Sequence, residues 1–347
     1  MGRLKPATSV IGLDVGRATV KAAQVTHHDK GPSLDGCVVL RRTAAGQSLE
    51  PDEAERLVRA MERRGLTTTR LVLTAPTDAL VGGSLNVPPT DSGAARDKII
   101  SMELSRAHKL SPGSFEMVWW DLPASSSGAR IGQVHALGLP HSAVEDSLQV
   151  LSELGLGIVR TVPSSLALLA TAQRYPVDPR CISAVIDLAS NSGHLSLMYA
   201  GRVVHERALP DFNLHKLTQV TSEIIGVEPA VAMRAFGLYG VSESPEGMLA
   251  CETNALLGDV IEPLAEEIGM SFSYVSHLYP EADLGQLLLS GGGANMPGLS
   301  ETLSTILELE TAVITPSGLL QGSEFGSECH DPALTQAVGA AVYGEAA

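Results

Sequence analysis

Short hydrophobic runs that end in an acidic residue and a small-residue turn occur at distant places along the chain. The first, at 10–26, reads VIGLDVGRATVKAAQVT. Its pattern predicts a buried strand ending at Asp14, a turn at Gly16 and a returning strand. A second stretch, at 184–204, reads AVIDLASNSGHLSLMYAGRVV and places Asp187 at the end of its first strand. The chain therefore predicts two similar acid-tipped hairpins, one in each half.

A third hydrophobic run, at 286–299, reads QLLLSGGGANMPGL. It predicts an apolar strand that enters a turn made of Gly291, Gly292 and Gly293, with a helix beginning at about Met296. Glycine lets backbone N–H groups approach a phosphate closely, and a carboxylate can hold the hydrated Mg²⁺ that accompanies it. Together the three stretches predict a cleft that grips one phosphate-bearing ligand from both sides.

Each of these motifs also has a plainer interpretation when it is taken alone. Asp-x-Gly turns occur in ordinary hairpins, and an aspartate at a strand end can simply cap the strand. A glycine run can be a plain strand-to-helix turn. The interpretation as a nucleotide site therefore depends on the three stretches meeting in space.

Apolar spacing and turn residues predict further strands and helices between these stretches. The strands are expected at 33–42, 71–73, 115–122, 133–139 and 312–314, and the helices at 50–64, 94–108, 141–154, 161–172, 213–239, 260–278, 299–309 and 332–343. The region 86–160 is expected to be an inserted small domain with two helices on a short sheet. Trp119 and Trp120 lie on one of its strands and fit either a partner-binding hot spot or ordinary packing.

In order and spacing, these elements resemble the actin-like ATPases, the group that includes actin, sugar kinases and heat-shock chaperones. Within that group the chain is similar, over nearly its whole length, to the PilM-type proteins of type IV pilus assembly. The similarity includes LDVGRATVKAAQV, VHALGLPHSAVEDSLQVLSELGLGIVRTVPSSLALLAT, IDLASNSGHLSLMYAGRVVHERALP and LLLSGGGANMPGLSETLSTILELETAVITPSG. The short motifs are moderately specific, whereas their order and spacing together are strongly specific.

The resemblance implies an α/β fold in which two ribonuclease-H-like halves flank a nucleotide cleft. It also implies inserted small subdomains, one of them like the extra subdomain of the cell-division protein FtsA. The expected units are a first half at 1–85 completed by 161–180 and 332–347, an inserted FtsA-like subdomain at 86–160, a second half at 181–215 and 283–331, and a small helical subdomain at 216–282.

The resemblance further implies that ATP and Mg²⁺ bind between the halves. Asp14 and Asp187 are expected to hold Mg²⁺ through water and to orient the attacking water, as the catalytic pair. The residues expected to contact the nucleotide are Gly16, Arg17, Thr19, Lys21, Ala189, Ser190, Asn191, Arg234, Gly291, Gly292, Gly293 and Ala294. Lys21 fits a phosphate contact and a solvated hairpin lysine equally well. No lysine follows a glycine in the sequence, so a P-loop is excluded.

Two departures from the family pattern weaken the expected nucleotide site. Arg17 and Ala18 follow the first acidic turn, where the family carries small hydroxyl residues. Ala189 stands where the second motif has glycine, and its Cβ is expected to crowd the terminal phosphate. We therefore expect ATP binding that is weaker than usual or lost, and at most a slow ATPase.

Composition narrows the range of partners. The 347 residues are 44% hydrophobic and 18% charged, as in globular proteins. A net charge of −15 with 4% aromatic residues argues against nucleic acid and against an anionic membrane surface as partners. The four cysteines lie far apart without metal-binding spacing, as in a reduced cytosolic protein. The sequence shows neither an apolar signal core nor an apolar run of roughly 18 residues, so we expect membrane association only through a partner.

The resemblance implies a cytoplasmic scaffold, peripheral to an inner-membrane pilus or secretion-like machine. It would dock the N-terminal cytoplasmic peptide of a PilN-like bitopic membrane protein through the region 86–160, with other motor components or a second copy of the chain as further candidate partners. Two alternatives stay open, a nucleotide-free pseudo-ATPase scaffold of the same fold and a small-molecule kinase of the sugar-kinase branch. The kinase alternative requires a catalytic base at a substrate pocket.

Overall fold

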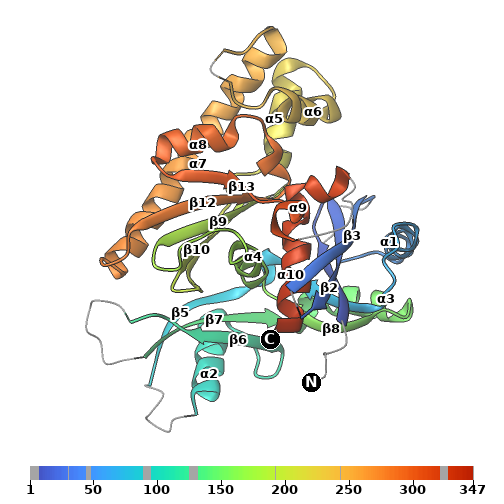
Figure 1. Ribbon diagram of the computed structural model, residues 1–347, viewed down its shortest axis with the longest axis vertical. Coiled ribbons are helices and arrows are strands. Elements are labelled where there is room, and N and C mark those ends of the chain that lie inside the picture. Colours follow the sequence, from blue (N-terminus) through green and yellow to red (C-terminus); the bar gives the residue numbers. More distant parts are fainter. Residues whose placement is uncertain are drawn as a thin grey trace.

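Two five-stranded sheets with the same internal order form the body of the molecule (Figure 1). The structure is a computed structural model, and it describes residues 8–29, 31–43, 48–88, 95–124, 132–191, 193–242, 244–320 and 327–346. In each sheet, three antiparallel strands are followed across the sheet by two parallel strands. The duplicated ribonuclease-H-like architecture expected from the sequence is confirmed.

The first sheet has the strand order β3-β2-β1-β4-β8 and the second β11-β10-β9-β12-β13. The strands of the first sheet are β1 (Thr8–Val15), β2 (Thr19–His28), β3 (Gly31–Arg41), β4 (Arg70–Thr74) and β8 (Gly157–Val162). Those of the second are β9 (Ile182–Leu188), β10 (Gly193–Tyr199), β11 (Arg202–Leu209), β12 (Leu284–Ser290) and β13 (Glu310–Val313). The two acid-tipped hairpins are therefore equivalent elements, β1–β2 in one half and β9–β10 in the other.

Two helices made of small residues lie between the sheets, α4 (Ser164–Ala172) and α10 (Thr335–Ala346) (Figure 1). Their close approach depends on glycine. A Cβ at Gly12 of β1 would collide with the backbone of Ala337, and one at Gly339 would collide with the backbone of Ala167. The resulting core joins side chains of both sheets, including Val10 and Val185. Small side chains thus let the helices hold the two halves together.

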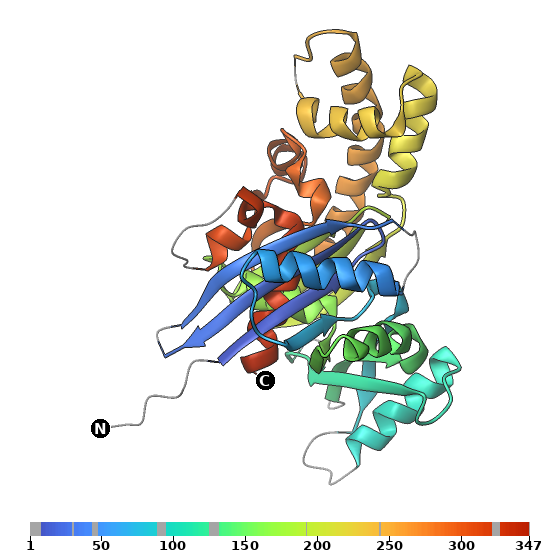
Figure 2. The same cartoon turned by 90° about the vertical axis from the view of Figure 1, so that its right-hand side faces the viewer.

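Other helices cover the outer faces of the sheets. On the first sheet these are α1 (Pro51–Arg63) and α3 (Glu145–Glu153), and on the second α7 (Met248–Leu278) and α8 (Leu299–Leu307). The small helical subdomain consists of α5 (Leu214–Ile225), α6 (Pro229–Tyr239) and the start of α7, and it projects from the second half (Figure 2). Among the described residues, no helix is both long enough and apolar enough to cross a membrane.

The inserted subdomain is built on a three-stranded sheet of order β5-β7-β6. Its strands are β5 (Val81–Val87), β6 (Phe115–Asp121) and β7 (Gly132–Pro140), and α2 (Arg96–His108) packs on β5 and β7. The second helix expected here was misplaced, since α3 packs on α1 and β8 in the first half. The boundaries expected at residues 86 and 160 fall inside β5 and β8.

Several element ends differ from those expected. The helix expected from residue 161 begins at Ser164, because Thr161 and Val162 pair with β4. The helix expected from Met296 begins at Leu299, because a short 3₁₀ turn, η4 (Gly292–Asn295), which includes two of the glycines, precedes it. The helix expected from residue 260 begins at Met248.

Candidate functional site

The mouths of the two acid-tipped hairpins open on one cavity of about 370 Å³ between the halves, which we call the cleft. Both Asp14 and Asp187 line it. The other expected site residues in its wall are Gly16, Arg17, Lys21, Ala189, Ser190 and Asn191. The cleft therefore gathers side chains that are more than 170 positions apart in the sequence.

Lys21 and Asp14 form a buried ion pair at the centre of the cleft. The two residues face each other in the β1–β2 ladder, and Lys21 Nζ lies 2.7 Å from Asp14 Oδ2. Thr74 Oγ1 lies 3.3 Å from the other carboxylate oxygen of Asp14. Burial alone would lower the pKa of Lys21, but Asp14 and, further away, Asp187 and Asp331 raise it above its usual value. The cleft thus carries its own fixed cation.

The turn between β1 and β2 is shaped to admit this lysine. A Cβ at Gly16 would lie 3.0 Å from Thr19 O and 3.2 Å from Lys21 Nζ, both tighter than most real contacts. The Gly16 N–H donates to Thr19 O at 3.0 Å, and Gly16 O accepts from Arg42 Nη1 at 3.1 Å. Arg42 is in turn fixed by a buried ion pair with Glu53, whose oxygen lies 2.9 Å from Arg42 Nη2. In this arrangement one amide of the turn is already used within the hairpin.

Arg17 lies in the wall of the cleft and forms a half-exposed ion pair there. Its Nη2 lies 3.0 Å from Oδ2 of Asp78, which also lines the cleft. Both side chains are about half exposed, at 45% and 46%, so the pair contributes little to stability. Its effect is to place a charged pair where a phosphate-bearing ligand would enter.

Asp187 lies at the end of β9, against the backbone of the triple-glycine turn. Burial raises the pKa of its carboxyl to about 6, with Lys21 and His194 opposing the rise and Asp14 adding to it. Gly291 has a φ of +82°, and a Cβ there would collide with Asp187 Oδ1. Glycine is therefore required next to this acid for two independent reasons, conformation and space.

The three glycines of this turn have different surroundings. Gly293 packs against Leu188, whose Cβ would lie 2.9 Å from an added Cβ. Gly292 is exposed, with open space around it. Ala294 is buried at 3% exposure. This turn backs onto Asp187 but does not itself line the cleft.

Ser190, in the cleft wall, ties the β9–β10 turn to the start of α5, because its O accepts from the N–H of His215 at 2.8 Å. Two other expected site residues lie outside the lining. Thr19 begins β2 outside the cleft lining. Arg234 lies exposed on α6, also outside the lining. Ser192, the remaining polar residue of the second turn, is outside the described residues.

Sequence reasoning missed several cleft residues. Ala75, Pro76 and Thr77 follow β4, Asn213 caps α5 through Lys216 N at 2.8 Å, and Gln336 comes from α10. Of these residues, the ones after β4 could have been predicted from the sequence. In open α/β sheets the ligand lies beyond the carboxyl ends of parallel strands, so the turn after β4 could have been expected at the cleft.

The donor set fits a phosphate-bearing ligand with Mg²⁺. Mg²⁺ is usually held by one or two carboxylates together with water and substrate phosphates, rather than by a cage of protein ligands. In the part of the chain that the structure describes, no group of three or more His, Cys, Asp or Glu side chains could hold a metal. Asp14 and Asp187 supply two carboxylates, and Lys21 supplies a cation for phosphate.

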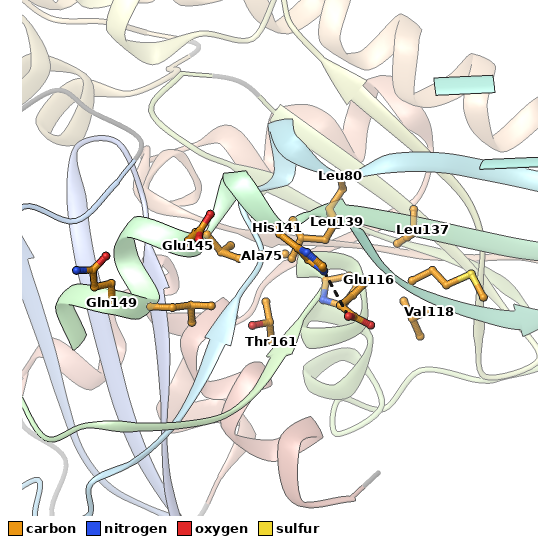
Figure 3. A pocket seen from close by; sticks show the side chains of 14 residues that line it. Ala75, Leu80, Glu116, Val118, Leu137, Leu139, His141, Glu145, Gln149 and Thr161 are labelled. Carbon is orange, nitrogen blue, oxygen red and sulfur yellow. Dashed lines mark hydrogen bonds and ion pairs between the residues drawn. The ribbon is translucent and has the colours of Figure 1, made fainter. Parts of the chain in front are cut away.

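A second, larger cavity of about 700 Å³ lies where the inserted subdomain meets the first half, and we call it the groove (Figure 3). Its walls come from β6 and β7, the start of α3, and the ends of β4 and β8. Its apolar lining includes Leu80, Met117, Val118, Leu137, Leu139, Val144, Leu148 and Pro163. Glu116 and Glu145 add negative charge, and His141 Nε2 lies 3.3 Å from Glu116 Oε1.

No protein-family model matches the sequence, and no curated protein matches it. Among solved structures, the fold is similar to a PilM–PilN type IV pilus biogenesis complex, with a TM-score of 0.79 and 18% identity over 98% of this chain and 99% of that chain. It is also similar to the ethanolamine utilization protein EutJ from Carboxydothermus hydrogenoformans, with a TM-score of 0.54 and 15% identity over 98% and 92% of the two chains. The actin-like fold expected from the sequence is confirmed.

Proposed function

We propose that this chain is a PilM-type scaffold that binds ATP in the cleft and docks the N-terminal tail of a PilN-like membrane protein in the groove. The observation that carries the proposal is the whole-chain similarity to the PilM–PilN complex, which includes the inserted subdomain and leaves almost none of either chain unmatched. The chemistry of the two cavities supports the two parts of the proposal separately.

The cleft supports nucleotide binding. Asp14 and Asp187 would hold Mg²⁺ and orient water, while Lys21 would meet a phosphate oxygen. When bound, Mg²⁺ would supply charge neutralisation at the terminal phosphate. Because Lys21 is bound to Asp14 and Ala189 lines the cleft, we propose slow hydrolysis at most.

The groove supports the docking of an extended peptide. Among the described strands β6 is at the edge of its sheet, and it lines the groove, so its outer edge could pair with an added strand. The apolar lining fits alternate side chains of such a strand. Glu116 and Glu145 favour a peptide that also carries basic residues, as the cytoplasmic tail of a bitopic membrane protein commonly does. The partner would hold the scaffold at the cytoplasmic face of the inner membrane.

Calorimetric titration of the full chain with a PilN-type tail peptide tests the docking part. We expect micromolar binding that weakens about tenfold in the Glu116→Lys, Glu145→Lys double variant, because both substitutions place positive charge beside a basic peptide. The double variant Glu55→Lys, Glu62→Lys on α1, outside the groove, makes the same change in net charge and should bind as wild type. Absence of any binding heat, or equal weakening in both variants, removes the support for the groove.

A nucleotide-free scaffold of the same fold is the second candidate. The specific observation in its favour is the ion pair between Lys21 and Asp14, which neutralises one cleft carboxylate without a metal. Titration of the same protein with Mg·ATP distinguishes the two. Measurable binding supports the nucleotide-binding scaffold, whereas no binding at millimolar ATP supports the second candidate. The small-molecule kinase gains no specific support from the described cleft residues.

A further inference from the structure

The inserted subdomain is fastened to the second half along β11. Trp120 Nε1, on β6, donates to Val203 O at 2.7 Å. On the neighbouring strand β7, His135 Nε2 lies 2.7 Å from Glu206 Oε2. The rings of Trp120 and His135 stack with centroids 5.0 Å apart. These contacts, together with that of Arg202 with Asp121 O, hold the inserted subdomain on the second half.

Glu206 also contacts a second histidine, which lies in its own sheet. His194 Nε2, on β10, lies 3.3 Å from Glu206 Oε1. The three side chains are buried, with exposures of 3% for His135, 10% for Glu206 and 15% for His194. Burial alone would raise the pKa of Glu206, but hydrogen bonds from the two histidines hold it well below its usual range. The structure therefore places a largely buried carboxylate within strand β11.

Neither histidine has another polar anchor in the part of the chain that the structure describes. The Nδ1 atoms of His135 and His194 are both buried without a hydrogen-bond partner there. Glu206 is therefore the group that orients both rings. A substitution of Glu206 should therefore affect both β7 of the inserted subdomain and β10 of the second half.

His194 also faces the cleft acid. It is the direct partner of Asp187 in the β9–β10 ladder, so the two side chains lie on the same face of the sheet. Glu206 lies diagonally from His194 on that face. The ring thus stands between two carboxylates, and its distance to Glu206 is longer than that of His135. Asp187, His194, Glu206 and His135 thus form a row, with polar contacts at Glu206 and, between Asp187 and His194, cross-strand proximity without a hydrogen bond among the described residues.

We propose that this row couples the net charge at Asp187 to the docking of the inserted subdomain. While Asp187 is negative, it competes with Glu206 for His194. Neutralising Asp187, by a bound cation or by substitution, leaves His194 to Glu206. Glu206 is then better fixed for His135, and the inserted subdomain docks more tightly. Since β6 and β7 also line the groove, a change of charge at Asp187 would also affect the groove.

Trp120 provides an internal reporter of this docking. The chain contains two tryptophans, so the Trp119→Phe variant leaves Trp120 as the single fluorescent indole. Acrylamide quenching of that variant measures access to the Trp120 ring. We expect Glu206→Gln to raise the quenching constant about twofold, and His135→Gln to do the same from the other side of the contact. The two substitutions together should add little to either one, because they break the same contact.

The coupling is tested by substitutions at the cleft end. Asp187→Asn should lower the quenching of Trp120, and this effect should disappear when His194→Gln is also present. His205→Gln is the matched control, because His205 is adjacent to Glu206 on β11 but its ring packs at a tilt against Tyr274, with centroids 5.0 Å apart. An equal effect of Asp187→Asn with and without His194 would overturn the coupling. So would a Glu206→Gln protein with wild-type quenching.

These measurements need neither nucleotide nor peptide, so they do not depend on the proposed function. The proposed function enters only in naming Mg·ATP as the ligand that neutralises Asp187. Added Mg·ATP should lower quenching in the Trp119→Phe protein but not when His194→Gln is present. If Mg·ATP does not bind but the substitutions behave as expected, the coupling stands and the ATP-binding part of the proposed function fails.

Discussion

Lys21 reaches across the first hairpin to Asp14, and its Nζ lies 2.7 Å from Asp14 Oδ2. The contact is nearly closed to solvent, with side-chain exposures of 14% and 11%. A lone buried carboxylate or ammonium is costly, so each residue depends on the other. A ligand that places Mg²⁺ on Asp14 must rearrange this pair, and Lys21 would then be released towards phosphate.

Lys21→Met is expected to destabilise the protein by about 1–3 kcal/mol, because it leaves Asp14 buried without its cation. Urea unfolding at pH 7 measures this. Adding Asp14→Asn should recover part of the loss, since the uncompensated charge is then gone. Lys98→Met on the exposed side of α2 is the control and should lie within about 0.5 kcal/mol of wild type. Strictly additive effects of the two cleft substitutions would contradict the pairing.

Much of the fold followed from sequence pattern because each half repeats one unit. The alternation in β1 and β2, with an acid at the strand end and glycine at the turn, is local and therefore readable. The sequence pattern does not predict β5, because Gly82 and Gly83 interrupt its apolar alternation. The position of α3 could not be read either, since an apolar stripe does not say which sheet it will cover.

The site residues likewise fall into those that a local motif marks and those that depend on distant contacts. Asp14, Gly16 and Asp187 are marked by motifs, and the structure places all three in the cleft lining. The contact of Arg17 with Asp78 spans 61 positions and that of His135 with Glu206 spans 71. No local pattern specifies such pairs, because they depend on how separate units pack.

The stability of the ligand-free protein should depend on Asp187 in a pH window set by its raised pKa. The folded state holds a proton on Asp187 up to about pH 6, whereas the unfolded chain releases it near the ordinary value of 3.8. The folded state therefore binds more protons between these values, and stability falls as pH rises through the window. Asp187→Asn removes this loss, so it should stabilise the protein at pH 7.5 by about 1–3 kcal/mol.

Urea unfolding in the presence of a chelator at pH 7.5 and at about pH 2.5 measures the effect of Asp187→Asn. The gain should vanish at the lower pH, which lies well below the ordinary value of 3.8, so that Asp187 is protonated in both states. Asp211→Asn, at an exposed position after β11, should show no gain at either pH. A gain of equal size at both pH values would mean that packing, not charge, is responsible.

Gly291→Ala and Gly292→Ala form a matched pair one residue apart. At Gly291 the new Cβ meets Asp187 Oδ1 and the backbone of Leu188 at a φ of +82°, so a loss of about 2–4 kcal/mol is expected. At Gly292 nothing lies within 4 Å and φ is not positive, so stability should change by less than about 1 kcal/mol. Thermal unfolding of both variants tests this. Equal losses would show that the glycine turn is not fitted to Asp187.

Ala189→Gly distinguishes a weakened nucleotide site from an absent one. Ala189 lines the cleft beside Asp187, and removing its Cβ permits closer approach of a phosphate to the backbone. Mg·ATP affinity, measured by calorimetry, should rise about tenfold, while the added chain freedom costs about 0.5–1 kcal/mol of stability. Ala208→Gly, at an exposed position of β11, should lose similar stability without any gain in affinity. If wild type already binds Mg·ATP tightly and Ala189→Gly changes nothing, then Ala189 does not crowd the phosphate and the nucleotide-free scaffold loses its support.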